Sequence, residues 1–202
     1  MEKSCKGAQI VAQANLPTKS GEFRILAFRS EGEAKDHVAL VKGSVAGKTC
    51  VPVRMHSECL TGDVFGSLRC DCNAQLNSAL RKIGKMPRGI IIYLRQEGRG
   101  IGLSNKIRAY ALQEKGMDTV EANIALGFPA DMRSYDAAAA ILRKLGVKSI
   151  ALITNNPLKI EGLSACGVKV EKRIPHEFGL TARNRKYLKT KKDKMAHILS
   201  RV

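Results

Sequence analysis

Residues 89–94 read Gly-Ile-Ile-Ile-Tyr-Leu, and residues 97–102 read Glu-Gly-Arg-Gly-Ile-Gly. The first run is apolar and of strand length, which predicts a strand buried on both faces of a sheet. The glycine-rich run predicts a loop directly after that strand. A second apolar run covers residues 149–154 and leads into residues 155–157, Asn-Asn-Pro. Proline early in a helix replaces an N–H that has no helical partner, so a helix is expected to start there.

Strands and helices alternate between and after these two runs. Helical patterns cover residues 105–115 and 134–145, and each ends at a glycine, Gly116 or Gly146. Residues 168–170 predict the last strand. This alternation predicts the α/β class.

The first third of the chain predicts strands that extend the same sheet. A helix is expected from Asn73, and a basic helix over residues 183–200. We expect one α/β domain over residues 1–202, with a mixed β-sheet flanked by helices, a β-rich N-terminal third and a basic C-terminal helix. Its core is expected at about 16–175 and its basic segment at 176–202. The early strands are expected at 22–28, 37–41 and 51–56.

The composition is that of a globular protein. Of the 202 residues, 44% are hydrophobic and 26% are charged. Every apolar run is too short to cross a bilayer, and residues 1–5 do not resemble a secretory signal. We therefore expect a cytoplasmic protein with no membrane partner.

The net charge of +17 favours anionic partners. From Lys172 to the end, the chain carries ten basic and two acidic residues, a net +8 within 31 residues. Two interpretations stay open for this basic segment. It is either a solvated helix face or mobile tail, or a segment that binds a polyanion.

Three cysteines are clustered in the pattern Cys59-x10-Cys70-Asp71-Cys72. Zinc prefers thiolates, and catalytic zinc keeps three protein ligands and one open position. Three interpretations remain: a catalytic zinc, a structural zinc completed by His56, or three buried free thiols. Cys70 and Cys72 would point to opposite faces of a regular strand, so both bind one ion only if they lie in a turn. Polar residues crowded beside Cys59 favour the catalytic site.

The glycine-rich loop interleaves Arg95, Glu97 and Arg99 with flexible backbone. Guanidinium groups suit phosphate oxygens, and a carboxylate such as Glu97 can accept hydrogen bonds from a guanine base. The alternative is a loop whose charges are merely solvated. Residues 131–133 (Asp-Met-Arg) are a weak signal alone. Residues 154–159 offer hydroxyl, amide and ammonium groups where α/β proteins bind anions, at a strand end and a helix start.

Long motifs in one register carry a resemblance to a known family. Residues 54–63 read Arg-Met-His-Ser-Glu-Cys-Leu-Thr-Gly-Asp, and Cys-Asp-Cys follows at 70–72. With the stretches 93–103, 105–113, 118–123 and 152–157, they closely resemble GTP cyclohydrolase II, an enzyme of riboflavin synthesis. The match runs from about Leu16 to Leu199.

The resemblance implies hydrolysis of GTP to a diaminopyrimidinone ribosylamine phosphate, with release of formate and pyrophosphate. It implies GTP as the partner, one Zn²⁺ per chain, Mg²⁺ on the triphosphate and a homodimer. It implies zinc on Cys59, Cys70 and Cys72, with Asp131 as proton acceptor, Arg133 as nucleophile and Tyr110 near the reacting base. It implies GTP contacts at Arg54, Met55, His56, Ser57, Glu58, Gln75, Glu97, Gly98, Arg99, Thr119, Thr154 and Lys159.

Physical chemistry qualifies two of these implied roles. Three thiolates leave a zinc site net negative and weaken its Lewis acidity, so neighbouring acid–base groups must assist. A guanidinium is a poor nucleophile because its pKa exceeds about 12, so Arg133 either transfers a proton to Asp131 or only clamps phosphate.

Other functions are weighed beside this one. The alternative from another class is a catalytically idle relative whose basic segment binds nucleic acid. Only 4% of residues are aromatic, which leaves few stacking surfaces, so nucleic acid is not the expected partner. A related enzyme that retains the formyl group is disfavoured by Tyr110. Some relatives are fused to a dihydroxybutanone-phosphate synthase, but 202 residues are too few for that second domain, so we expect one activity.

Overall fold

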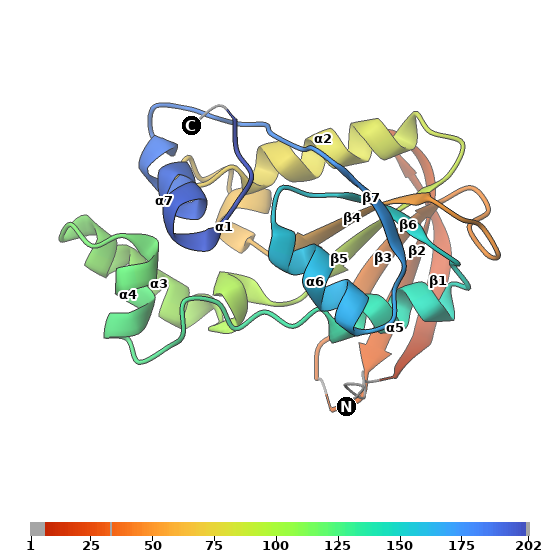
Figure 1. The fold of residues 1–202 in the computed structure, drawn as a ribbon, viewed down its shortest axis with the longest axis horizontal. Coiled ribbons are helices and arrows are strands. Elements are labelled where there is room, and N and C mark those ends of the chain that lie inside the picture. Colours follow the sequence, from red (N-terminus) through yellow and green to blue (C-terminus); the bar gives the residue numbers. More distant parts are fainter. Residues whose placement is uncertain (1–6, 33, 201–202) are drawn as a thin grey trace. The chain divides into compact units, whose positions relative to one another are not determined.

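The computed structural model of the chain describes residues 7–32 and 34–200. Its strands form one seven-stranded sheet in the order β1-β2-β3-β5-β4-β6-β7 (Figure 1). Pairs β1/β2, β2/β3 and β3/β5 are antiparallel, whereas β4/β6 and β6/β7 are parallel, so the sheet is mixed. The strands are β1 Ala8–Thr18, β2 Gly21–Ser30, β3 His37–Lys42, β4 Val51–Ser57, β5 Gly89–Leu94, β6 Ile150–Ile153 and β7 Val170–Ile174.

The helices are short, and none in residues 7–32 and 34–200 has the length and apolar character needed to cross a membrane. They are α1 Leu60–Asp63, α2 Cys72–Gly84, α3 Leu103–Glu114, α4 Thr119–Ala125, α5 Asp136–Lys144, α6 Pro157–Ala165 and α7 Arg185–Met195, with a 3₁₀ turn η1 at Glu97–Gly100. The α/β class, the mixed sheet, the β-rich N-terminal third and the basic C-terminal helix are confirmed.

The chain separates into two compact units, each assembled from separate segments. The sheet unit contains the described residues up to His56, with Asn77–Arg95 and Ser134–His176. The helical unit contains Ser57–Leu76, Gln96–Arg133 and the described residues from Glu177 onward.

An apolar core fills the sheet unit. Helix α5, a row of alanines followed by Ile141 and Leu142, packs against β1, β2 and β5. On β5, Ile90 and Ile92 face this core, and Ile91, which points to the other face, is also only 1% exposed. Both faces of the central strand are therefore covered, as its continuous apolar sequence predicted.

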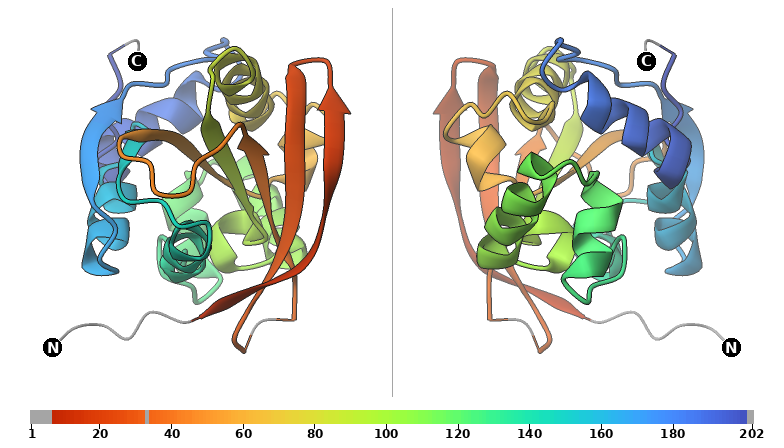
Figure 2. Two further views of the ribbon diagram at one scale, coloured as in Figure 1. Left: turned by 90° about the vertical axis from the view of Figure 1, so that its right-hand side faces the viewer. Right: turned by 90° about the vertical axis from the view of Figure 1, so that its left-hand side faces the viewer.

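Within the helical unit, α3 and α4 pack together and α7 contacts α4 (Figure 2). On α3, the apolar Ile107 is 50% exposed. The buried positions are Lys106 and Ala109, because a polar contact rather than apolar packing anchors this helix.

Strand β1 and helix α4 are among the elements that the sequence analysis missed, and helix α7 was predicted too long. Strand β1 lies at the sheet edge beside β2 (Figure 2), and most of its side chains are exposed, so it lacks an apolar alternation. Helix α4 begins at a capping box formed by Asp118 and Glu121, a signal that could have revealed it. Helix α7 covers Arg185–Met195 rather than residues 183–200, because Ala196 adopts a left-handed conformation that ends it.

Candidate metal centre and nucleotide site

The three clustered cysteines converge within the helical unit. Cys59 directly precedes α1, Cys70 lies in a bend, and Cys72 is the first residue of α2, so the predicted turn is present. The Sγ atoms of Cys59 and Cys70 are 3.8 Å apart, and all three sulfurs lie within 4.8 Å of one another. Two thiolates at about 2.3 Å from one tetrahedral ion would be about 3.8 Å apart. The spacing fits a metal ion.

A glycine makes room for this cluster. A Cβ added at Gly62 would lie 2.9 Å from Cys70 Sγ and 3.1 Å from Cys59 Sγ. The sulfurs therefore surround a position that only a residue without a side chain can occupy.

The cluster offers three donors. Within residues 7–32 and 34–200, no His, Asp or Glu joins the three cysteines as a further potential ligand. His56, the fourth ligand of the alternative structural site, belongs to the sheet unit and stacks on Tyr93 with ring centroids 5.5 Å apart. Three protein ligands, rather than four, are the number that catalytic zinc sites use, and thiolate sulfur is a donor that zinc accepts.

A buried lysine, which the sequence analysis did not identify, contacts the cluster. Lys106 Nζ donates to Cys59 Sγ at 3.2 Å and to Glu97 Oε1 at 2.7 Å. The other Glu97 oxygen accepts from the Leu60 N–H at 2.6 Å. Both side chains are about nine-tenths buried, so a cation is fixed beside the sulfur atoms. Its position four residues before Tyr110, on the same face of α3, was the available signal.

These contacts set the protonation of the group. Hydrogen bonds from the Cys70 and Cys72 thiols, with a smaller effect of Lys106, hold the pKa of Cys59 well below its usual range. The pKa of Cys70 rises to about 11 because its thiol donates to Cys59. Burial alone would lower the pKa of Lys106, but Glu97 and Cys59 raise it above its usual value. The group thus pairs one thiolate with one ammonium.

Tyr110 lies close to the sulfurs through one intermediate residue. Its hydroxyl is 3.1 Å from Thr61 Oγ1, which is 3.8 Å from Cys59 Sγ. Burial raises the pKa of the phenol, so Tyr110 keeps its proton near neutral pH. A neutral proton donor therefore stands beside the candidate metal site.

The glycine-rich loop adopts a left-handed backbone at several successive residues. Arg99 has φ +61°, an uncommon conformation for a residue with a side chain. Its carbonyl accepts from the Met132 N–H at 3.1 Å, and a Cβ added at Gly100 would lie 3.0 Å from Met132 Cβ. The loop is therefore folded tightly against residues 131–133.

Asp131 and Arg133 form a buried ion pair beside this loop. Arg133 Nε donates to Asp131 Oδ1 at 2.8 Å, and Nη2 donates to Oδ2. Burial would raise the pKa of Asp131, but Arg133 and, more weakly, Arg99 hold it below its usual value. Asp131 is thus an ionised carboxylate flanked by two guanidinium groups.

In the sheet unit, other predicted residues gather at the carboxyl ends of β4 and β6. Arg54 Nη1 donates to the Ile153 carbonyl at 3.0 Å, and Lys159 Nζ donates to the Met55 carbonyl at 2.8 Å. Thr154 Oγ1 accepts from the Asn156 N–H at 3.0 Å. Ligands bind at the carboxyl ends of parallel strands in α/β proteins.

The remaining predicted residues take varied positions in the helical unit. Ser57 Oγ accepts from Gln96 Nε2 at 3.0 Å, and Gln75 Nε2 donates to Asp71. Glu58 is partly buried, Gly98 is in the left-handed loop, and Thr119 is the first residue of α4.

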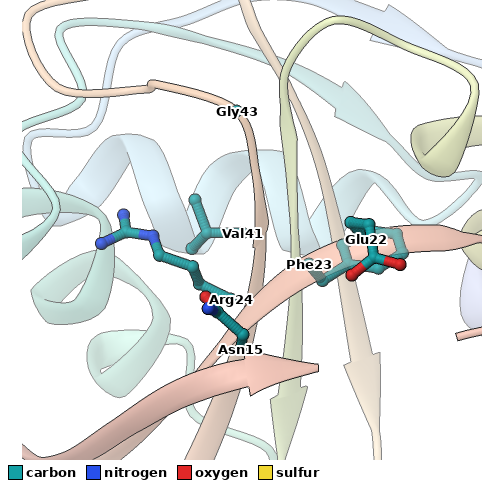
Figure 3. A pocket seen from close by; sticks show the side chains of 6 residues that line it. All are labelled: Asn15, Glu22, Phe23, Arg24, Val41 and Gly43. Atoms are coloured by element: carbon teal, nitrogen blue, oxygen red, sulfur yellow. The ribbon is translucent and has the colours of Figure 1, made fainter. Parts of the chain in front are cut away.

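An open hollow of about 400 Å³ lies elsewhere in the sheet unit (Figure 3). None of its lining residues is a predicted site residue. They are Asn15, Glu22, Phe23, Arg24, Val41 and Gly43.

The comparisons agree on one family. The family model for GTP cyclohydrolase II matches residues 8–175. A GTP cyclohydrolase-2 from Aeromonas hydrophila is 52% identical over 192 residues, covering 95% of this chain and 98% of that protein. A GTP cyclohydrolase-2 from Picrophilus torridus is 52% identical over 190 residues, covering 94% of this chain and 98% of that protein.

A longer relative also matches. The riboflavin biosynthesis protein RibBA from Endomicrobium trichonymphae is 53% identical over 192 residues, which cover 95% of this chain but 48% of that protein. The chain therefore spans about half the length of RibBA and nearly all of the two GTP cyclohydrolase-2 proteins.

Proposed function

The chain belongs to the GTP cyclohydrolase II family, and we propose that it hydrolyses GTP at a zinc site as a step of riboflavin biosynthesis. The proposed products are 2,5-diamino-6-ribosylamino-pyrimidinone 5′-phosphate, formate and pyrophosphate. The observation that carries this proposal is the group of three cysteines, with a buried lysine on one sulfur.

The residues around the cysteines are proposed to supply a compensating positive charge and a proton donor, which the metal itself does not provide. A zinc ion held by Cys59, Cys70 and Cys72 would supply Lewis acidity and lower the pKa of water. The ammonium of Lys106 offsets the negative charge of the thiolates, the assistance that such a site requires. Tyr110, protonated and joined to Cys59 through Thr61, is placed to give a proton to the nitrogen released when the base opens.

Arg133 acts in this proposal as a fixed cation and not as a nucleophile. Asp131 has a lowered pKa, so it is a weak base for removing a proton from a guanidinium. Arg99 and Arg133 would instead bind the phosphates, together with Mg²⁺, and offset the charge of departing pyrophosphate. Thr154 and Lys159, both buried, are proposed as further GTP contacts.

We propose a homodimer as the assembly and the cytoplasm as the location. Several large apolar side chains of the helical unit are exposed, including Phe65 at 73%, Val64 at 67% and Ile124 at 61%. Exposed apolar side chains of this size favour a protein partner. Light scattering on the purified protein, compared with a Phe65→Ser variant, tests the dimer.

One experiment tests the function. The purified protein is incubated with GTP, Zn²⁺ and Mg²⁺, and formate, pyrophosphate and guanosine monophosphate are quantified together by mass spectrometry. We expect formate and pyrophosphate in equal amounts. A protein that releases pyrophosphate alone or leaves GTP intact contradicts the proposal.

Three variants separate the metal from the rest of the site. Cys70→Ser is expected to lose zinc and formate release, whereas His56→Ala is expected to keep one zinc per chain. Loss of zinc from His56→Ala would instead mean a closed structural site. Arg133→Ala is expected to keep zinc and to lose pyrophosphate release.

A further inference from the structure

The C-terminal segment, Glu177–Ser200, holds the turn that carries two of the three cysteines. Lys191 Nζ on α7 donates to Asp71 Oδ1 at 2.8 Å. Both side chains are nearly nine-tenths buried or more, with 12% of Lys191 and 3% of Asp71 exposed. Asp71 is the single residue between Cys70 and Cys72, so this buried ion pair bears directly on both candidate ligands.

Two further contacts join the segment to the same turn. Asn184, only 1% exposed, donates from Nδ2 to the Cys70 carbonyl at 3.4 Å and to the Gly179 carbonyl at 2.6 Å. Gly179 adopts a left-handed φ of +78°, and a Cβ there would lie 2.6 Å from Ala74 Cβ. The segment therefore approaches the start of α2 as closely as a glycine allows.

The segment is also anchored away from the turn. Lys194 pairs with Asp118 and with Glu121 at 3.0 Å, and Lys186 Nζ donates to the Gly116 carbonyl at 3.3 Å. These contacts use basic residues internally, which disagrees with a mobile tail. The family model ends at residue 175, before this segment begins.

We propose that Lys191 is a positioning residue of the metal centre, which acts through Asp71 to hold Cys70 and Cys72 in ligand geometry. This inference rests on the proposed metal site at the three cysteines. A buried carboxylate that loses its cation must regain water, so the turn moves outward and carries both thiols with it. Groups that orient metal ligands typically change metal affinity about 10- to 100-fold when they are removed.

The variant Lys191→Met tests the proposal, with Lys189→Met as a matched control. Lys189 lies on the same helix and is exposed, so its variant has the same change in charge and size. Zinc affinity is measured by competition with a chromogenic chelator, and ligand geometry by the absorption bands of the Co²⁺-substituted protein. We expect Lys191→Met to bind zinc about 10- to 100-fold more weakly with shifted Co²⁺ bands, Lys189→Met to match the wild type, and Lys191→Arg to restore most of the affinity.

A double-mutant cycle isolates the route through Asp71. In an Asp71→Asn background no buried carboxylate needs a cation, so Lys191→Met is expected to have a much smaller effect on zinc affinity. An equal effect in both backgrounds overturns the proposal, as does an unchanged zinc affinity and Co²⁺ spectrum in Lys191→Met. Failure of the wild type itself to bind zinc or Co²⁺ overturns the metal site instead.

Amide exchange of the metal-free protein provides a measurement that does not depend on metal binding and that can be made on a variant that is partly destabilised. We expect Lys191→Met to accelerate exchange at residues 70–76 while strands β2 and β5 keep the wild-type rate. Equal exchange at residues 70–76 in wild type, Lys191→Met and Lys189→Met overturns the proposal.

Discussion

The interior of the sheet unit and the interior of the helical unit are stabilised by different kinds of interaction. The largest fully buried side chains, such as Phe28, Ile92 and Leu152, all belong to the sheet unit. The sheet unit also buries Arg54 and Lys159, but the helical unit buries ion pairs, those of Lys106 with Glu97 and of Lys191 with Asp71. Burial of apolar groups is non-directional, whereas a buried charge is tolerated only with its partner in place.

Because of this difference, the stability of the helical unit should depend on what the site binds, whereas that of the sheet unit should not. The sheet unit should keep its fold whatever the site binds. The helical unit carries the three cysteines and few large apolar side chains that are buried, so its buried ion pairs, and the proposed metal when it binds, take the place of an apolar core. Four changes, given in order of decreasing expected effect, test this difference between the two units.

Removal of the metal is expected to have the largest effect. A chelator should destabilise the helical unit by more than about 4 kcal/mol, the contribution of a ligand present at a thousand times its dissociation constant. Amide exchange followed by mass spectrometry should show faster exchange in Ser57–Leu76 and Gln96–Arg133, with β2, β3 and β5 unchanged. Equal acceleration in both units would contradict the division.

Lys106→Met is expected to be next in size. The change leaves the buried Glu97 carboxylate without its cation, and breaking a buried pair costs about 3–5 kcal/mol. Urea unfolding and zinc content measure it, and both should fall. Lys115→Met, at the exposed end of the same helix, is the control and should leave both unchanged. A fully stable Lys106→Met protein would show that the pair does not hold this unit together.

Ile92→Ala is the counterpart in the sheet unit. Ile92 is fully buried, so its truncation should lower the free energy of unfolding by about 3 kcal/mol. Zinc content should stay at the wild-type value, which is the reverse of the pattern expected for Lys106→Met. Ile107→Ala, at a half-exposed position, should change stability by less than about 0.5 kcal/mol.

The same contrast explains how much the sequence could predict. In the sheet unit, apolar runs such as residues 89–94 determine buried strands directly, because burial on both faces leaves no polar position. Edge strand β1 was not predicted, because most of its side chains are exposed and its sequence therefore lacks an alternation of apolar and polar residues. In the helical unit, a helical pattern was expected over residues 105–115, but the burial of Lys106 could not be predicted from it, because this side chain is paired with Glu97 and Cys59 rather than packed among apolar groups.

The candidate site divides in the same way. Residues whose chemistry is local, such as Cys59, Cys70 and Cys72, could be identified from spacing and resemblance, and the structure brings their sulfurs together. Lys106 and Lys191 were missed because their importance comes from contacts with Cys59 and Asp71, which are distant from them in sequence. Lys191 and Lys194 pair with Asp71 and Glu121. A variant that neutralises all the lysines of α7 would therefore change the stability of the helical unit as well as the attraction of an anionic substrate.

The smallest effect concerns the N-terminus of α4, where the carboxylate of Asp118 both caps the helix and pairs with a lysine. Asp118 Oδ1 accepts from the N–H groups of Val120 and Glu121 at 2.7 Å and 3.0 Å, and Asp118 also pairs with Lys194. Burial would raise the pKa of Asp118, but Lys194 and the two N–H groups lower it. Its contribution to stability is therefore present above the unfolded pKa near 3.9 and is lost as pH falls through the lower folded pKa.

Asp118→Ala should lower the stability of the helical unit by about 1 kcal/mol at neutral pH, the usual value of a helix cap. Asp118→Asn separates the two roles, because its amide oxygen still accepts from the N–H groups but carries no charge for Lys194. If the cap dominates, Asn should recover most of the loss, and salt should have little effect on the difference from wild type. Urea unfolding at pH 7 and pH 3 measures both variants, and the deficit of Asp118→Ala should shrink at the lower pH. An Asn variant as unstable as the Ala variant would assign the stability to the ion pair of Asp118 with Lys194 on α7, which is only partly buried, and pairing would then stabilise the helical unit at its surface as well as in its interior.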